Sequence, residues 1–282
     1  DDGVQDGAQG YTVVTAAATS ADPTYNGLNP VDVSVTNADN DGAGITVSPT
    51  SGLTTTETGG SATFAVVLTS LPTANVTIGL SSSDLTEGTV APASLTFTPS
   101  NWSTPQTVTV TGVNDALSDG DLAYAIVTAA ASSADAAYNG VDAADVGVTN
   151  ADNDTPGVTV SPTSGLLTTE AGGTATFTIA LNSQPTANVS IGLSSNDATE
   201  GTVAPASVTF TSANWNTPQT VTVTGVNDAV DDGDITYSIV TAAATSGDAN
   251  YSGMNATDVS VTNTDNDAAG ITVSPTSGLV TT

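Results

Sequence analysis

The nonapeptide Ile45-Thr-Val-Ser-Pro-Thr-Ser-Gly-Leu53 returns almost unchanged at residues 158–166 and again at residues 271–279, in steps of 113 residues. Without a gap, residues 45–153 align with residues 158–266 at 79 of 109 identical positions. Self-similarity at a fixed period is the sequence signature of a tandem repeat. The 113-residue repeat is therefore the unit whose fold and function have to be explained.

The repeat divides the chain into two whole copies and two incomplete ones. The expected domains are 1–41, the last third of a repeat; 42–154 and 155–267, two whole repeats; and 268–282, the first strand of another repeat. The two end pieces together supply only about half of the repeat's positions, too few to rebuild a domain between neighbouring chains. We expect the array to continue in both directions.

Within a repeat, apolar residues alternate with small or polar ones at a period of two, which is typical of half-buried strands. Glycine and proline separate these short runs. The pattern predicts an all-β protein of tandem immunoglobulin-like antiparallel sandwiches, with seven or eight strands per repeat. The residues predicted to form the core of the first whole repeat are Phe64, Leu68, Val76, Ile78, Phe97 and Val108.

The composition excludes several classes of function. The 282 residues include 29 acids but no lysine, arginine, histidine or cysteine. Nucleic-acid binding is excluded because it needs cationic side chains, which the chain does not have. A catalytic serine would have no histidine base, and there is no cysteine to act as a nucleophile. Zinc sites built on imidazole or thiolate have no ligands, and no apolar run is long enough to span a membrane. A paired-carboxylate glycosidase is the one enzyme mechanism left open, and we expect no enzyme, because catalytic sites are rarely multiplied in near-identical repeats.

The acids form clusters that recur at equivalent positions of the repeat. The clustered positions are Asp2, Asp6, Asp39, Asn40 and Asp41 in the leading partial repeat; Glu57, Asp84, Glu87, Asp115, Asp119, Asp121, Asp152, Asn153 and Asp154 in the first whole repeat; and Glu170, Asp197, Glu200, Asp228, Asp232, Asp234, Asp265, Asn266 and Asp267 in the second. Calcium takes six to eight oxygen ligands from carboxylates, amides and backbone carbonyls. A net charge of −29 without any cationic side chain opposes the compact state unless ions from outside offset it.

Some of these residue types have a simpler explanation, because Asp, Asn and Gly are ordinary turn formers. We interpret Asn139-Gly140, Asp22-Pro23 and Asp142 in that way. For the loop at 115–121 and the linker at 152–154, metal binding is the favoured interpretation. Trp102 and Trp215 are predicted to cap the core, although an exposed tryptophan could also stack on a sugar ring.

The repeat resembles the Calx-beta domain, a calcium-binding sandwich. Glu57 and Glu170 match the family's glutamate before the second strand, residues 114–121 and 227–234 match its acidic loop, and residues 148–154 match its closing strand and Asp-Asn-Asp. The resemblance implies calcium bound at one end of each sandwich, close to the next linker. The family's Asp-Gly-Thr-Ala stretch is absent, so either Asp84 or Glu87 is expected to take the place of its ligand. The expected metal ligands are the clustered positions named above, except Glu87 and Glu200. At the place of the missing Asp-Gly-Thr-Ala ligand, Asp84 and Asp197 are the predicted ligands.

We therefore expect a structural segment of a secreted or cell-surface repeat protein, a calcium-stiffened rod, stalk or filament. Its expected partners are calcium ions, adjacent repeats and, by lateral self-association, other chains. An extracellular place follows from the calcium interpretation, because weak sites of about 10⁻⁴–10⁻³ M fill only outside the cytosol. The alternative is a cell-adhesion or glycan-binding module of a surface adhesin.

Overall fold

The computed structural model describes residues 2–281, and all regular secondary structure in that range is β-strand. The chain divides into two compact units. The first comprises Asp1–Asp115 and Gly120–Asp152, and the second comprises Ala116–Asp119 and Asn153–Thr282. The predicted fold class, all-β with immunoglobulin-like sandwiches, is confirmed. Within the described range, no helix has the length and apolar character needed to cross a membrane.

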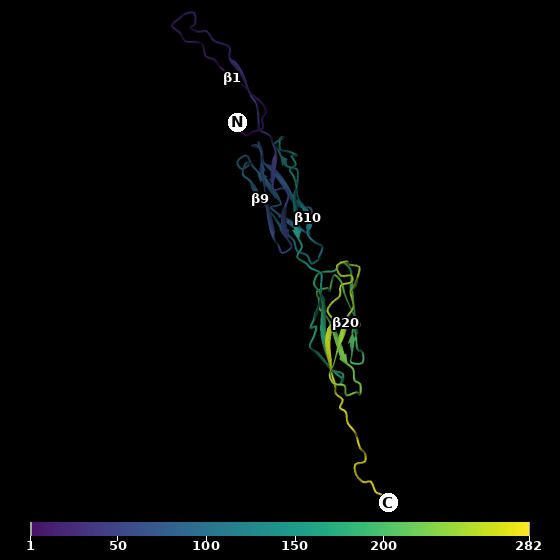
Figure 1. Ribbon diagram of the computed structural model, residues 1–282. Coiled ribbons are helices and arrows are strands. Elements are labelled where there is room, and N and C mark those ends of the chain that lie inside the picture. Colours follow the sequence, from purple (N-terminus) through teal and green to yellow (C-terminus); the bar gives the residue numbers. More distant parts are fainter. Residues whose placement is uncertain (1, 282) are drawn as a thin grey trace. The chain divides into compact units, whose positions relative to one another are not determined.

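In the first unit two sheets enclose one core. The four-stranded sheet has the order β3 (Ile45–Ser48), β5 (Ser61–Leu68), β9 (Gln106–Gly112) and β7 (Gly88–Ala91). The second sheet has the order β11 (Ser132–Ser133), β6 (Val76–Ser82), β10 (Leu122–Thr128), β12 (Val146–Ala151) and β4 (Leu53–Thr56), and β8 (Ser94–Phe97) also pairs with β6. Figure 1 labels β9 and β10, one strand from each of these sheets.

The second unit repeats this topology. Its four-stranded sheet has the order β13 (Val158–Ser161), β15 (Thr174–Leu181), β19 (Gln219–Gly225) and β17 (Gly201–Ala204). Its other sheet has the order β14 (Leu166–Thr169), β22 (Val259–Thr264), β20 (Ile235–Thr241), β16 (Val189–Ser195) and β18 (Ser207–Phe210), and β21 (Thr245–Ser246) pairs with β16.

The leading partial repeat forms a two-stranded antiparallel sheet of β1 (Gln9–Val13) and β2 (Val33–Asn37). Tyr11 aligns with Tyr124 of the first whole repeat and pairs with Val35, as Tyr124 pairs with Val148. Tyr11 is 55% exposed, whereas Tyr124 is 6% exposed. The same local sequence therefore gives the same strand pair in both places, and only the surrounding strands bury it.

Each whole repeat differs from the prediction in its number of strands, and one of its strand pairs is parallel instead of antiparallel. The first has ten strands, β3 to β12, rather than seven or eight. The segment Pro49–Gly52 interrupts the first predicted strand, so that β3 pairs with β5 while β4 moves to the other sheet. There β4 lies parallel to β12, with Leu53 opposite Val148. Glu57 directly follows β4 and Asp152 directly follows β12, so this parallel pair brings the two acidic segments to the same edge of the sheet.

The predicted core is confirmed. Phe64, Leu68, Val76, Ile78, Phe97 and Val108 are all 3% exposed or less. Trp102 and Trp215 are partly buried and pack against the cores of the first and second units, as predicted for core-capping aromatic residues. The apolar positions of the alternation therefore face the core, as predicted.

One buried tyrosine closes a loop over each core. The Tyr138 hydroxyl donates to the Ser70 carbonyl oxygen at 2.6 Å and accepts from the Ser70 N–H at 2.9 Å, and Tyr138 is 1% exposed. Tyr251 makes the same pair of bonds with Ser183 in the second unit. The ring fills the core while its hydroxyl satisfies a buried peptide group.

We expect Tyr138→Phe to lower the unfolding free energy of the first unit by about 1–3 kcal/mol, because both Ser70 backbone groups lose their partner. Urea unfolding followed by circular dichroism measures the change. Tyr25→Phe is the matched control, because Tyr25 occupies the aligned position in the leading partial repeat and is 60% exposed. Equal effects of the two substitutions would contradict the prediction.

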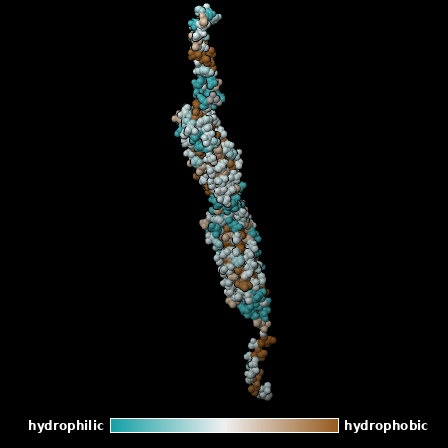
Figure 2. All heavy atoms as spheres, turned by 90° about the vertical axis from the view of Figure 1, so that its left-hand side faces the viewer, coloured by the Kyte–Doolittle hydropathy of each residue, from teal (hydrophilic) through white to brown (hydrophobic). Residues whose placement is uncertain are grey.

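Charge is kept out of the sheets. None of the strands from β1 to β22 contains an aspartate or glutamate, so the acids within residues 2–281 all lie in loops and turns. Threonine, serine, alanine and glycine occupy most of the outward positions of the strands, with a few apolar residues such as Leu122 and Leu167 among them. The visible surface of the sandwiches is mostly of intermediate hydropathy (Figure 2). Loop geometry therefore decides which carboxylates meet.

Candidate metal centre

The parallel pair of β14 and β22 brings two acidic segments of the second unit together. Thr169 lies opposite Thr264 in this pair. Parallel strands end on the same side of a sheet, so Glu170 and the segment 265–267 leave the sheet side by side. The Glu170 N–H extends the contact by donating to the Thr264 carbonyl oxygen at 3.1 Å.

A second pairing brings the acidic loop at 227–234 to the same place. β17 and β19 are antiparallel, with Gly201 opposite Gly225. Glu200 precedes β17, and its carbonyl oxygen accepts from the Val226 N–H at 2.9 Å. The loop that follows Val226 carries Asp228 and Asp232, so these acids start next to Glu200.

Two groups of carboxylates result, and they share one residue. The first group is Glu170, Asp228 and Asp267, and the second is Glu200, Asp228 and Asp232. In each group, one carboxylate oxygen from every member lies within 4.8 Å of the others. Two oxygens bound to one calcium ion at 2.3–2.6 Å can be at most about 5 Å apart. Each group can therefore contribute three ligands to one ion, with Asp228 between the two ions.

Burial makes these groups unusual among surface acids. Glu170 is 3% exposed and Glu200 is 6% exposed. The Asp267 Oδ2 atom is buried and has no hydrogen-bond partner. A buried carboxylate oxygen without a donor or a counter-charge costs several kcal/mol. The chain has no lysine, arginine or histidine to supply that counter-charge, so a cation from solution is the partner that fits.

The electrostatics of Glu170 agree with this reading. The Asn266 N–H donates to Glu170 Oε2 at 3.1 Å and lowers the pKa of the carboxyl. Burial and the negative charges of Asp265, Asp228 and Asp267 act in the opposite direction, and the net effect raises the pKa of Glu170. Convergent carboxylates raise one another's pKa in this way until a cation neutralises them.

Other predicted ligands hold the loops in shape. Asp265 accepts from the Asp267 N–H at 2.7 Å and from the Gly233 N–H at 2.8 Å, and these donors lower its pKa. The Asp265 N–H in turn donates to Asp234 Oδ1 at 3.2 Å. Asn266 donates from its side chain to Asn227 Oδ1 at 2.9 Å. These contacts tie the acidic loop to the segment that follows β22.

The structure places Asp197 and Asp84 in tight turns. Asp197 accepts from the Thr199 hydroxyl and N–H, and both donors lower the pKa of its carboxyl. Asp84 makes the equivalent bonds with Thr86. Among the described residues, the carboxylate groups contain Glu200 and Glu87 in place of these two aspartates. The recurring acids include both glutamates, but the ligands predicted from the sequence at this place are the aspartates.

In the first unit the same elements bring equivalent acids together. Glu57 lies with Asp152, and Glu87 lies with Asp115, each pair with carboxylate oxygens within 4.8 Å. Asp152 accepts from the Gly120 N–H at 2.8 Å, and its own N–H donates to Asp121 Oδ1 at 3.1 Å. The other predicted ligands of this repeat, Asp119, Asn153 and Asp154, belong to the second unit.

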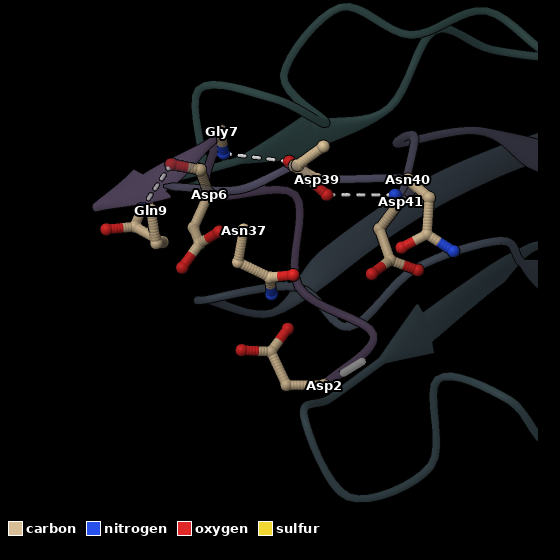
Figure 3. A pocket seen from close by; sticks show the side chains of 9 residues that line it. Asp2, Asp6, Gly7, Gln9, Asn37, Asp39, Asn40 and Asp41 are labelled. Atoms are coloured by element: carbon tan, nitrogen blue, oxygen red, sulfur yellow. Dashed lines mark hydrogen bonds between the residues drawn. The ribbon is translucent and has the colours of Figure 1, made fainter. Parts of the chain in front are cut away.

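The leading partial repeat carries part of such a centre. Asp2, Asp6, Asp39, Asn40 and Asp41 line one hollow (Figure 3). Asp39 accepts from the Gly7 and Asp41 N–H groups, which lower its pKa. Among the residues that the structure describes, this hollow does not bring three carboxylate oxygens within 4.8 Å of one another. The segment has no counterpart of Glu170 or Glu200, which come from the first two thirds of a repeat.

Comparison with known proteins gives matches at the level of structure. No family model matches the sequence, and no curated protein does. Solved structures similar to this chain include CBD12 from CALX1.2, at 15% identity and a TM-score of 0.33 over 71% of this chain and 80% of that one. The calcium binding domain CBD12 of CALX1.1 is similar at 16% identity and a TM-score of 0.35, with the same coverage. Domains 4 and 5 of the S-layer protein SbsC are similar at 14% identity and a TM-score of 0.29, over 66% of this chain and 75% of that one.

Proposed function

We propose that this chain is a calcium-binding structural segment of an extracellular repeat protein, in which calcium stiffens a rod, stalk or filament. The observation that carries the proposal is the buried Asp267 Oδ2 atom, which has no hydrogen-bond partner and lies with Glu170 and Asp228. An oxygen-only donor set in loops suits a hard cation of flexible coordination, and calcium fits that description.

The arrangement of the repeat supports a mechanical role. One carboxylate group of the second unit, through Asp267, includes the segment that follows β22, where the repeated sequence ends and the next copy begins. An ion held there restrains the segment that leads out of the sandwich. Near-identical copies also suit a structural module that is repeated in order to lengthen a rod or stalk. In this proposal the chain has no catalytic activity.

The adhesive alternative has less support. Its best candidates for stacking on a sugar, Trp102 and Trp215, are partly buried and pack against the cores. Binding to a glycan array by the intact chain would revive that alternative.

Small-angle scattering on the intact chain tests the stiffening. With calcium, we expect a larger maximum dimension and a narrower distribution of distances than with a chelator. Asp152→Ala combined with Asp154→Ala should give the chelator result in the presence of calcium. Asp22→Ala combined with Asp142→Ala is the matched control, because it removes the same charge at exposed loop positions.

An unchanged scattering profile in all conditions, with both units still folded, would remove calcium from the mechanical role. Isothermal titration of the same samples with calcium separates that outcome from a failure to bind the ion at all.

A further inference from the structure

A buried amide lies directly behind the candidate metal centre of the second unit. Asn263, in β22, is 1% exposed. Its Nδ2 atom donates to Glu200 Oε2 at 3.3 Å and to the Val226 carbonyl oxygen at 3.0 Å. Its Oδ1 atom accepts from the Thr168 hydroxyl at 3.0 Å. All of the hydrogen-bonding groups of this amide are therefore used, and one of its two N–H groups is directed to a carboxylate of the centre.

The direction of each bond in this network is fixed by chemistry. The Thr168 hydroxyl lies 3.0 Å from the Asn263 carbonyl oxygen and 3.5 Å from the Thr262 carbonyl oxygen, and both oxygens can only accept, so the single proton of Thr168 is donated to the nearer one, that of Asn263. The Tyr237 hydroxyl, 3.3 Å from the Thr168 hydroxyl, must then be the donor in that contact. The chain of bonds runs from Tyr237 through Thr168 and Asn263 to Glu200. A rotated amide would place its oxygen against the Glu200 carboxylate, which is repulsive.

Two glycines leave room for this network. A Cβ atom on Gly225 would collide with the Asn263 side-chain oxygen and with the backbone of Thr169. A Cβ atom on Gly201 would collide with the Tyr237 hydroxyl and ring. The backbone therefore approaches the amide and the phenol so closely that neither side chain can move in that direction, which limits the orientations open to Asn263.

The first unit contains the same network. Asn150, also 1% exposed, donates to Glu87 Oε2 at 3.3 Å and to the Val113 carbonyl oxygen at 3.0 Å. It accepts from the Thr55 hydroxyl, which contacts the Tyr124 hydroxyl. The amide and the glutamate therefore keep the same geometry in both whole repeats.

We propose that Asn263 is a positioning residue for the metal centre, which holds the Glu200 carboxylate in the orientation that a calcium ion requires. This inference rests on the proposed calcium function and names the residue on which the geometry of the centre depends. Residues that orient metal ligands through hydrogen bonds typically change metal affinity by about 10- to 100-fold when they are removed.

A double-mutant cycle on the intact chain tests this role, with calcium affinity and stoichiometry measured by isothermal titration. Asn263→Ala should weaken the second-unit sites about 10- to 100-fold, and Glu200→Gln should weaken them by a similar factor. The double variant should bind no more weakly than the weaker single variant, because Asn263 acts through Glu200. Asn214→Ala is the matched control, because it removes a half-buried amide that bonds only within its own turn, to Thr211.

Two further measurements distinguish a loss of calcium affinity from a general loss of folding stability. Melting in a chelator reports how much each substitution destabilises the sandwich without calcium. Thr168→Val removes the donor to the Asn263 oxygen while it keeps the side-chain shape, so the same cycle with Glu200→Gln can be completed if Asn263→Ala does not fold. Factors that multiply in the double variant, or an unchanged affinity in Asn263→Ala, would overturn the positioning role. Absence of calcium binding by the unsubstituted chain would overturn the proposed function as well.

Discussion

Removal of calcium should lower the melting temperature of this chain by roughly 10 °C or more. A ligand that binds only the native state stabilises it by RT ln(1 + [L]/Kd), about 2.7 kcal/mol per site at a hundredfold excess over Kd. For a domain of this size, each kcal/mol shifts the melting temperature by about 4 °C. Scanning calorimetry in calcium and in chelator measures the shift.

The effect must be separated from general screening, because a net charge of −29 also responds to salt. Sodium chloride at matched ionic strength is therefore the first control. Asp228→Ala should remove most of the calcium-dependent shift of the second unit, because Asp228 belongs to both carboxylate groups. Asp142→Ala removes the same charge at an exposed loop position and should keep the shift. Superimposed melting curves with calcium and with chelator would exclude a stabilising metal.

Replacing Phe97 by alanine should lower the unfolding free energy of the first unit by about 3–5 kcal/mol. Phe97 is 0% exposed in β8, opposite Val76 of β6. The substitution removes the buried ring and leaves a cavity that the surrounding strands cannot fill. Urea unfolding of the whole chain should show one destabilised transition, while the second unit keeps its own core.

Leu85→Ala is the control for this substitution. Leu85 lies in the same unit and is 70% exposed, so its truncation should change stability by no more than about 0.5 kcal/mol. A cost below about 1 kcal/mol for Phe97→Ala would mean that this ring does not support the core.

The sequence predicted the sandwich because its signal is local and repeated. Phe64 and Leu68 face inward on β5, as their spacing requires, and the aligned Phe177 and Leu181 do the same on β15. The pairing of β4 with β12 was not predicted, because the break at Pro49–Gly52 does not reveal that the chain changes sheets there. Long-range pairing of this kind leaves no period in the sequence.

The candidate site was predictable in outline and not in its details. The recurring acids identified the loops at one end of the sandwich, but Asp84 and Glu87 lie three residues apart in one loop and have similar chemistry. The structure separates them, because Asp84 accepts from its own turn while Glu87 is buried beside Asn150. Asn150 itself carried no metal signal in the sequence, because an amide that acts behind a ligand has no characteristic spacing.

The confinement of the acids to loops throughout residues 2–281 has a consequence for how separate molecules of this chain approach one another. Like-charged chains without any cationic group repel at a distance, and this repulsion keeps them dispersed. The outward sheet faces, however, contain only uncharged strand residues, so they oppose contact at short range far less than the charged loops do. Salt screens all the acids equally, whereas a divalent ion that settles in the loops discharges the very groups responsible for dispersal. Under the proposed function, calcium therefore controls colloidal behaviour together with stability, and the chain is least protected from aggregation when it is most firmly folded.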